Sequence, residues 1–383
     1  MSVTVPGGFA NAHSHVFHRA LRGRAQAPGS FWTWREQMYD LAAALDPDLL
    51  HRLARAVYGE MRLAGWTAVG EFHYVHHGPG GRRYDDPNAM GDALVAAARE
   101  AGIAICLLDT CYLASGFGEA PQGVQTRFSD GDADAWASRV EEMRARHAGE
   151  PDVVVGAAAH SVRAVPADQL GTVAAWAQGH RAPLHVHLSE QPAENQACLA
   201  AHGMTPTALL DAHGFWGPAT TAVHATHLTD DDVATIGAAS SFACFCPTTE
   251  RDLADGVGPG PALEAAGARL TLGSDGHAVV DPFAEMRALE DDERLVSGRR
   301  GTWSASRLLR AGGPDGHASL GLPGSHDVEV AWGGPHLAGV PEGPEGLVFG
   351  ATAADVVNDP DEAHAVADEL RRAVEDCWAR VGR

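Results

Sequence analysis

The stretch PLHVHLSE, residues 183–190, is a short apolar run that ends in polar side chains. His185 and His187 stand two positions apart within it, and Glu190 closes it. Side chains alternate between the two faces of a strand, so these two imidazoles point the same way. We interpret the stretch as a buried strand with chemically active side chains at its carboxyl end.

The same pattern recurs along the chain, where apolar runs of strand length alternate with stretches of helical periodicity. The other runs are residues 67–74, 103–112, 153–160, 220–228, 240–248 and 269–276, and helical stretches include 48–63, 88–101 and 134–147. Such alternation predicts βα units and a parallel sheet. If residues 7–15 end a further strand, there are eight units, and eight units in about 300 residues predict a TIM barrel. A doubly wound open sheet is the alternative, although no glycine-rich phosphate loop follows the first strand.

Composition narrows the classes of partner. The chain has 383 residues and a formal charge of −22, which argues against nucleic acid or an anionic membrane as a partner. No apolar run is long enough to span a membrane, the first residues do not resemble a signal peptide, and the six cysteines form no disulfide framework. We therefore expect a cytoplasmic protein, in which an anionic substrate needs a local cluster of arginine or histidine.

Polar residues at the predicted strand ends suggest a metal site. In a TIM barrel the catalytic groups lie at the carboxyl ends of the strands. With 21 histidines, roughly one His-x-His is expected by chance, so one such pair is a weak signal. Two are present, at His13/His15 and His185/His187, and His224 and Asp275 follow at later strand ends. Imidazoles together with one carboxylate are typical ligands of Zn²⁺.

This combination resembles the one-metal deaminases of the amidohydrolase superfamily. The spacing His-x-His-x-x-Glu at residues 185–190 is similar to the branch that deaminates purines, triazines and related C=N compounds. Longer motifs are more specific and resemble the formimidoylglutamate deiminase family: NAHSHVFHRALRG (11–23), FWTWREQMY (31–39), GEFHYVHH (70–77), HSVRAV (160–165), HLSEQ (187–191), CPTTERDL (246–253) and GSDGH (273–277). The resemblance extends from about residue 7 to about residue 312 and reinforces the TIM barrel prediction.

The resemblance implies a role for each candidate residue. It makes His13, His15, His187 and Asp275 the ligands of one Zn²⁺ ion per chain, with Fe²⁺ as the alternative metal. Asp275 would also accept the proton of the attacking water. Glu190 would carry a proton to the substrate nitrogen, and His224 would orient the water and stabilise the tetrahedral intermediate.

The implied substrate is N-formimidoyl-L-glutamate, a small dianion that would be hydrolysed to N-formyl-L-glutamate and ammonia in histidine breakdown. Arg35 and Arg163 would clamp its carboxylates, because a guanidinium pairs with a carboxylate through two hydrogen bonds. The resemblance adds His18, Tyr74 and His160 as further substrate-binding residues. Two alternatives stay open: another aminohydrolase of this branch acting on a purine or other cyclic C=N compound, and a non-catalytic barrel relative. We expect no nucleic acid or membrane partner, and a homodimer is the expected assembly if the chain associates.

The two ends of the chain depart from the family pattern. Relatives build a small β-sandwich from residues before the first His-x-His and from a C-terminal segment, whereas here only twelve residues precede His13. We predict a barrel over residues 1–311 and, over 312–383, an irregular Gly/Pro-rich tail with a C-terminal helix at 359–381. Residues 329–334 and 346–357 are the strand candidates of this tail. We therefore expect the flanking sandwich to be reduced or absent.

Overall fold

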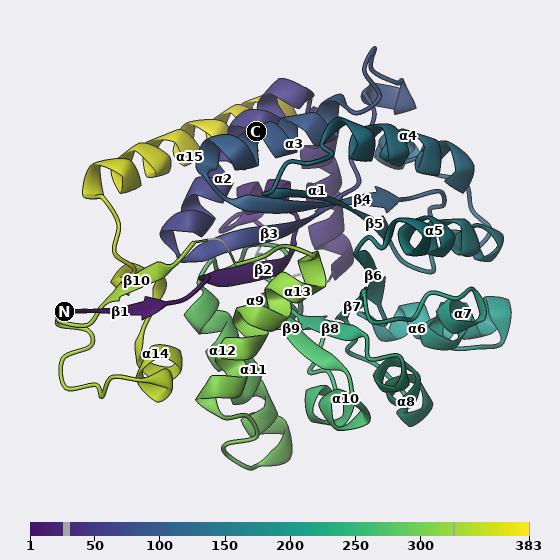
Figure 1. Ribbon diagram of the computed structural model, residues 1–383. Coiled ribbons are helices and arrows are strands. Elements are labelled where there is room, and N and C mark those ends of the chain that lie inside the picture. The colour runs from purple at the N-terminus through teal and green to yellow at the C-terminus, as the bar shows by residue number, and fades with distance from the viewer. Residues whose placement is uncertain (26–30, 325, 383) are drawn as a thin grey trace.

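A ring of eight parallel strands forms the centre of the computed structural model, which describes residues 1–25, 31–324 and 326–382 (Figure 1). Each strand pairs with the next one along the chain. The strands are β2 (Phe9–Ser14), β3 (Trp66–His73), β4 (Ala104–Cys111), β5 (Val153–Ala159), β6 (Leu184–Leu188), β7 (Thr220–His224), β8 (Phe242–Phe245) and β9 (Arg269–Leu272). All seven runs predicted between residues 67 and 276 contain a strand, and the predicted first strand is β2.

Backbone contacts between the first and last strands bring the sheet to closure. The amide of His15 donates to the carbonyl of Asp275 at 3.2 Å, and the amide of Asp275 donates to the carbonyl of His13 at 2.9 Å. A parallel bridge joins Ser14 to Asp275. The fold is therefore a TIM barrel, as predicted, and the open doubly wound sheet is wrong.

Helices cover the outside of the barrel because the strands are buried on both faces and need apolar cover. They include α2 (Pro47–Leu63), α3 (Ala89–Ala101), α4 (Ala133–Arg146), α5 (Ala167–His180), α6 (Pro192–His202), α7 (Pro206–Ala212), α8 (Asp230–Ala238), α10 (Gly260–Ala266), α11 (Pro282–Ser297) and α12 (Ala305–Gly312). Side-chain caps set their starts: Asp46 accepts from the amide of Leu49 and Asp132 from that of Ala135, both at 2.8 Å. The three predicted helices at 48–63, 88–101 and 134–147 correspond to α2, α3 and α4.

Short elements follow several strands on the side where the strands end. These are η1 (Val16–Leu21), α1 (Phe31–Ala44), η2 (Pro79–Gly81), η3 (Gly123–Arg127) and α9 (Pro247–Leu253). The buried side chain of Arg127 fixes α1 to the barrel, because its guanidinium donates to the carbonyls of Ala42 at 2.5 Å, Ala43 at 3.0 Å and Leu45 at 2.6 Å. The segment after β2 is thereby attached to the segment after β4.

The tail contains more regular structure than expected. Beside α15 (Pro360–Val381), which matches the predicted C-terminal helix and packs along α2, it forms α13 (Pro314–Leu320), β10 (Val328–Ala331), α14 (Pro344–Gly350) and η4 (Ala353–Asp355). The strand candidate at 329–334 contains most of β10, whereas the candidate at 346–357 is wrong, because it forms α14 and η4 instead. The domain limits of 1–311 and 312–383 stay a prediction.

Beside the barrel, the described residues form one further sheet, which has two strands. β10 pairs antiparallel with β1 (Ser2–Val5), with Ser2 opposite Ala331 and Val5 opposite Val328. Within the described residues, this two-stranded sheet lies where the prediction placed a reduced or absent β-sandwich. Within the described residues, no helix is both long and apolar enough to cross a membrane.

Candidate active site

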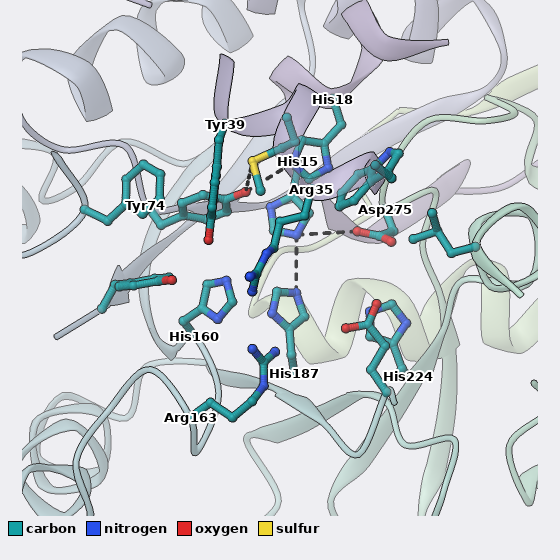
Figure 2. A pocket seen from close by; sticks show the side chains of 16 residues that line it. His15, His18, Arg35, Tyr39, Tyr74, His160, Arg163, His187, His224 and Asp275 are labelled. Carbon is teal, nitrogen blue, oxygen red and sulfur yellow. Dashed lines mark hydrogen bonds and ion pairs between the residues drawn. The ribbon is translucent and has the colours of Figure 1, made fainter. Parts of the chain in front are cut away.

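A pocket of about 590 Å³ opens at the carboxyl ends of the barrel strands (Figure 2). Ten of the eleven predicted site residues line it: His15, His18, Arg35, Tyr74, His160, Arg163, His187, Glu190, His224 and Asp275. The eleventh, His13, is fully buried, and its ring contacts those of His15 and His187. The structure therefore brings every predicted site residue together.

The predicted metal ligands form a tight cluster. The Nε2 atom of His187 lies 3.1 Å from that of His13 and 3.3 Å from that of His15. Oδ1 of Asp275 lies 3.3 Å from Nε2 of His13 and 3.4 Å from Nε2 of His15. Four atoms held about 2.0–2.1 Å from a tetrahedral Zn²⁺ lie about 3.3–3.4 Å from one another. These four separations suit a zinc-sized ion. Within the described residues, His13, His15 and His187 lie within 4.8 Å of one another, whereas all four donor atoms do not.

The ionisation states of the cluster suit a cation. Burial lowers the pKa of His13 to about 3, so this imidazole is neutral near pH 7. Burial alone would raise the pKa of Asp275, but the hydrogen bond to His13 and the neighbouring histidines outweigh it and hold that pKa far below its usual range. Neutral imidazoles and an ionised carboxylate are the forms that bind a metal.

Hydrogen bonds to groups outside the cluster orient its ligands. Nδ1 of His15 lies 2.9 Å from the carbonyl of Phe72, which can only accept, so this nitrogen carries the proton and Nε2 offers its lone pair. Ser14, between the two ligands, donates from Oγ to Glu71 at 2.9 Å. The end of β2 is thus held before any metal binds.

Glu190 and His224 lie beside the cluster. Nε2 of His224 is 3.8 Å from Oε1 of Glu190, and Nδ1 is 3.3 Å from Oε1 of Glu250 on α9. Burial alone would lower the pKa of His224, but Glu190 and Glu250 outweigh it and raise that pKa well above its usual value. Burial also raises the pKa of Glu190, which favours a proton on this carboxyl group.

Strained backbone holds some of these side chains in place. His224 has a φ of 66° and Asp275 a φ of 41°, in the left-handed region that residues other than glycine rarely adopt. Ser189, just before Glu190, has a φ of 49°. Such strain of about 1–3 kcal/mol per residue clusters at functional sites, where the surrounding structure compensates for it.

Two guanidinium groups enter the pocket from opposite sides. Figure 2 shows Arg35, from α1, and Arg163, from the loop after β5, both directed toward the space beside His160 and His187. Nε of Arg163 donates to Oε2 of the buried Glu194 at 3.3 Å, which leaves other donors of the fork for a ligand. The pocket thus combines a metal-type donor set with two cations.

The remaining predicted substrate residues pack on this side of the pocket. The hydroxyl group of Tyr74 lies 3.1 Å from Nε2 of His18, and the ring of His160 contacts that of Tyr74 at a centroid distance of 5.4 Å. His18 and Tyr74 are nearly fully buried. They shape the wall of the pocket beside the metal-ligand cluster.

The sequence analysis missed several residues of the pocket. These are Trp34, Met38, Tyr39, Tyr112, Phe128 and Leu253, together with Glu250 behind His224. Tyr112 follows the end of β4, so the strand-end rule could have found it. Tyr39 and Glu250 lie within the motifs at 31–39 and 246–253 but carried no separate signal.

Comparisons with known proteins agree with this geometry. The model of the amidohydrolase family matches residues 3–328. The chain is similar to formimidoylglutamate deiminase of Pseudomonas aeruginosa, with 38% identity over 95% of this chain and 78% of that protein. It is also similar to 8-oxoguanine deaminase of the same organism, with 29% identity over 73% of this chain and 61% of that protein.

Solved structures show the same architecture. An amidohydrolase from Brucella melitensis aligns with a TM-score of 0.89 and 29% identity over 98% of this chain and 90% of that chain. An adenosine deaminase from Xanthomonas campestris, solved with bound zinc, aligns with a TM-score of 0.84 over 99% and 86% of the two chains. Its identity of 21% supports the shared fold alone.

Proposed function

Since the chain belongs to the amidohydrolase family, we propose that it is a metal-dependent deiminase that hydrolyses N-formimidoyl-L-glutamate to N-formyl-L-glutamate and ammonia. The observation that carries the proposal is the joint lining of one pocket by a metal-type donor set, Glu190 and two arginines. The formimidoyl group would lie at the donor set, and the two carboxylates of the substrate would lie at the guanidinium groups. The 38% identity to a formimidoylglutamate deiminase supports this choice of substrate.

The donor set fits Zn²⁺, which His13, His15, His187 and Asp275 would hold. When bound, such an ion supplies Lewis acidity that lowers the pKa of a coordinated water toward neutrality. In our proposal Asp275 accepts a proton from the attacking water. His224, fixed by Glu250 on its Nδ1 side, donates from Nε2 to the oxygen of the attacking water, which orients this water toward the C=N carbon and stabilises the same oxygen in the tetrahedral intermediate.

Glu190 completes the reaction by moving protons. It gives its proton to the imine nitrogen, which becomes an amine. The amine then takes the proton held by Asp275, the hydroxyl group of the tetrahedral intermediate gives its proton to Glu190 as the C=O bond forms, and the C–N bond breaks to release ammonia. Arg35 and Arg163 hold the substrate carboxylates during these steps and compensate locally for the acidic chain.

Ammonia release tests the proposal. Purified protein loaded with zinc should release ammonia from N-formimidoyl-L-glutamate, and a chelator should abolish the release until zinc is added back. Guanine and adenosine serve as control substrates for the purine alternative. A folded, zinc-loaded sample that releases ammonia from a purine and none from N-formimidoyl-L-glutamate contradicts the proposal, and a sample inactive on all three supports the non-catalytic alternative.

A further inference from the structure

Three side chains that the sequence analysis did not assign form a hydrogen-bonded group in one wall of the pocket. They are Tyr39 on α1, Tyr112 just after β4 and Gln125 on η3, and we call them the Gln125 group. Nε2 of Gln125 donates to the hydroxyl oxygen of Tyr39 at 3.1 Å and to that of Tyr112 at 2.8 Å. Both tyrosines line the same pocket as Arg35 and Arg163.

The orientation of the Gln125 amide is fixed by the backbone. The amide N–H of Gln122, at the start of η3, donates to Oε1 of Gln125 at 3.1 Å. A backbone N–H can only donate, so the atom it meets must be the oxygen, and the NH₂ group must face the tyrosines. Gln125 is buried, which keeps water from competing for these bonds. The two phenol oxygens therefore accept from Gln125.

This arrangement decides where the phenol protons can go. Neither hydroxyl group can donate to Gln125, because its facing group is itself a donor. The two hydroxyl groups also interact with each other, so one proton can lie between them while the other is left for a ligand. Burial raises the pKa of Tyr112, so this phenol keeps its proton. An anion that enters between the two hydroxyl groups would receive both protons.

The Gln125 group lies on the arginine side of the pocket. The guanidinium carbon of Arg35 is 5.5 Å from the centre of the Tyr39 ring, and the ring of Tyr112 is 4.7 Å from that of His160. Figure 2 shows the hydroxyl end of Tyr39 directed toward His160 and the guanidinium of Arg35, with His224 and Asp275 across the pocket. The two hydroxyl groups thus face the region that the proposed function assigns to carboxylates.

We propose that Tyr39 and Tyr112, oriented by Gln125, are specificity-determining residues that donate two O–H hydrogen bonds to one carboxylate of the substrate. This inference rests on the proposed function. It adds to the ion pairs with the arginines two hydrogen bonds from neutral hydroxyl groups, whose directions are fixed. A carboxylate can accept both protons, whereas an N–H edge of a purine ring cannot accept either. Gln125 is a positioning residue that acts through the two tyrosines.

The test combines variants with substrate analogues. The substrates are N-formimidoyl-L-glutamate, N-formimidoyl-4-aminobutyrate, which lacks the α-carboxylate, and N-formimidoyl-2-aminobutyrate, which lacks the side-chain carboxylate. The double variant Tyr39→Phe/Tyr112→Phe should raise KM for the full substrate at least tenfold, with kcat changed less than threefold. The increase should vanish for the one analogue that lacks the carboxylate bound by the pair. Equal increases for all three substrates, or none, overturn the inference.

Gln125→Glu separates positioning from the mere presence of the hydroxyl groups. The new carboxylate would accept both phenol protons and turn them away from the pocket, so the same carboxylate-selective increase in KM should appear although both hydroxyl groups remain. An effect of the added charge alone would raise KM for both analogues equally. Ala120→Glu, at an exposed position before η3, adds the same charge and should leave KM unchanged. Equal increases in both analogues with Gln125→Glu overturn the positioning role.

A failure of the proposed function is distinguishable from a failure of this inference. If the wild-type protein releases no ammonia from N-formimidoyl-L-glutamate, the proposed function fails, and calorimetric binding of glutarate then tests the pair by itself. If Tyr39→Phe/Tyr112→Phe binds glutarate at least tenfold more weakly than the wild-type protein, the result supports carboxylate binding by the two tyrosines. Equal affinity in the wild-type protein and in this variant overturns it.

Discussion

In the proposed function, proton transfer by Glu190 can be tested separately from metal binding. Its side chain reaches His224 but is absent from the four-atom donor cluster. Glu190→Gln should therefore lower kcat about 10²–10⁴-fold, the usual size of a general acid–base contribution, while zinc content by metal analysis stays unchanged. A variant that keeps its zinc and turns over at nearly the wild-type rate would remove Glu190 from the proton path.

In the proposed function, Arg163 combines substrate binding with the neutralisation of the buried carboxylate of Glu194. Arg163→Met should raise KM about 10–100-fold, the effect of losing a hydrogen bond to a charged group worth about 1.5–3 kcal/mol. It should also destabilise the protein, because Glu194 loses its partner in the interior. Adding Glu194→Gln should restore the melting temperature and leave KM high. Recovery of KM in the double variant would show that Arg163 acts through Glu194 and does not bind substrate.

Strand ends and the family resemblance together predicted the cluster of candidate metal ligands better than the wall around it. His13, His15, His187 and Asp275 follow from strand ends and recognisable motifs. Gln125 has no such signal, because its importance depends on where η3 places it against residues 39 and 112. Hydrogen bonds between distant loops follow from tertiary packing, which local patterns do not contain.

At the scale of elements, α1 is the support of the arginine side of the pocket. It carries Arg35 and Tyr39, and the guanidinium of Arg127 holds its C-terminal end. Arg127→Met would leave several buried carbonyl groups unsatisfied, each at a cost of about 1–3 kcal/mol. We expect a loss of at least about 3 kcal/mol in the free energy of unfolding by urea, together with a raised KM.

A surface arginine provides the matched control for this variant. Arg144 is 43% exposed and pairs only with Glu141 on the same helix, at 3.5 Å, among the ion pairs of the described residues. Arg144→Met should change stability by less than about 1 kcal/mol. If Arg127→Met and Arg144→Met lower the free energy of unfolding by the same amount, Arg127 does not anchor α1.

The helix α13 shows why parts of the tail escaped prediction. The segment around it, GGPDGHASLGLPG at residues 312–324, is dense in glycine, which favours a loop, yet Gly316 lies against β2. A Cβ atom at position 316 would come within 3.0 Å of both the carbonyl oxygen and the side chain of Ala10. This glycine therefore permits close packing, a reason that composition cannot distinguish from flexibility. Pro314, at the first helical position, and Asp315, in the first turn, were the available start signals.

For the whole molecule, the proposed metal site would join distant parts of the barrel. Its donors come from β2, from β6 and from the segment after β9, so a bound ion cross-links the ring. Removing zinc with a chelator should lower stability by about 3–4 kcal/mol if the ion had been present at 100–1,000 times its dissociation constant. Thermal melts with and without chelator measure this, and added zinc should reverse the loss.

The matched control for the chelation experiment is His13→Ala. This variant should melt at one temperature whether or not the chelator is present, because it lacks one donor of the site. A wild-type protein whose melting temperature ignores the chelator, despite bound zinc, would contradict the cross-linking role.

The closure of the barrel also determines when the site can form during synthesis. The ribosome makes His13 and His15 well before residue 275, but the backbone bonds between β2 and residue 275 need the last strand of the ring. A nascent or truncated chain that ends before residue 275 therefore presents two or three exposed histidines and no complete cage. Full-affinity capture of the ion would be a late event, so unfinished chains compete only weakly for the metal supply of the cell.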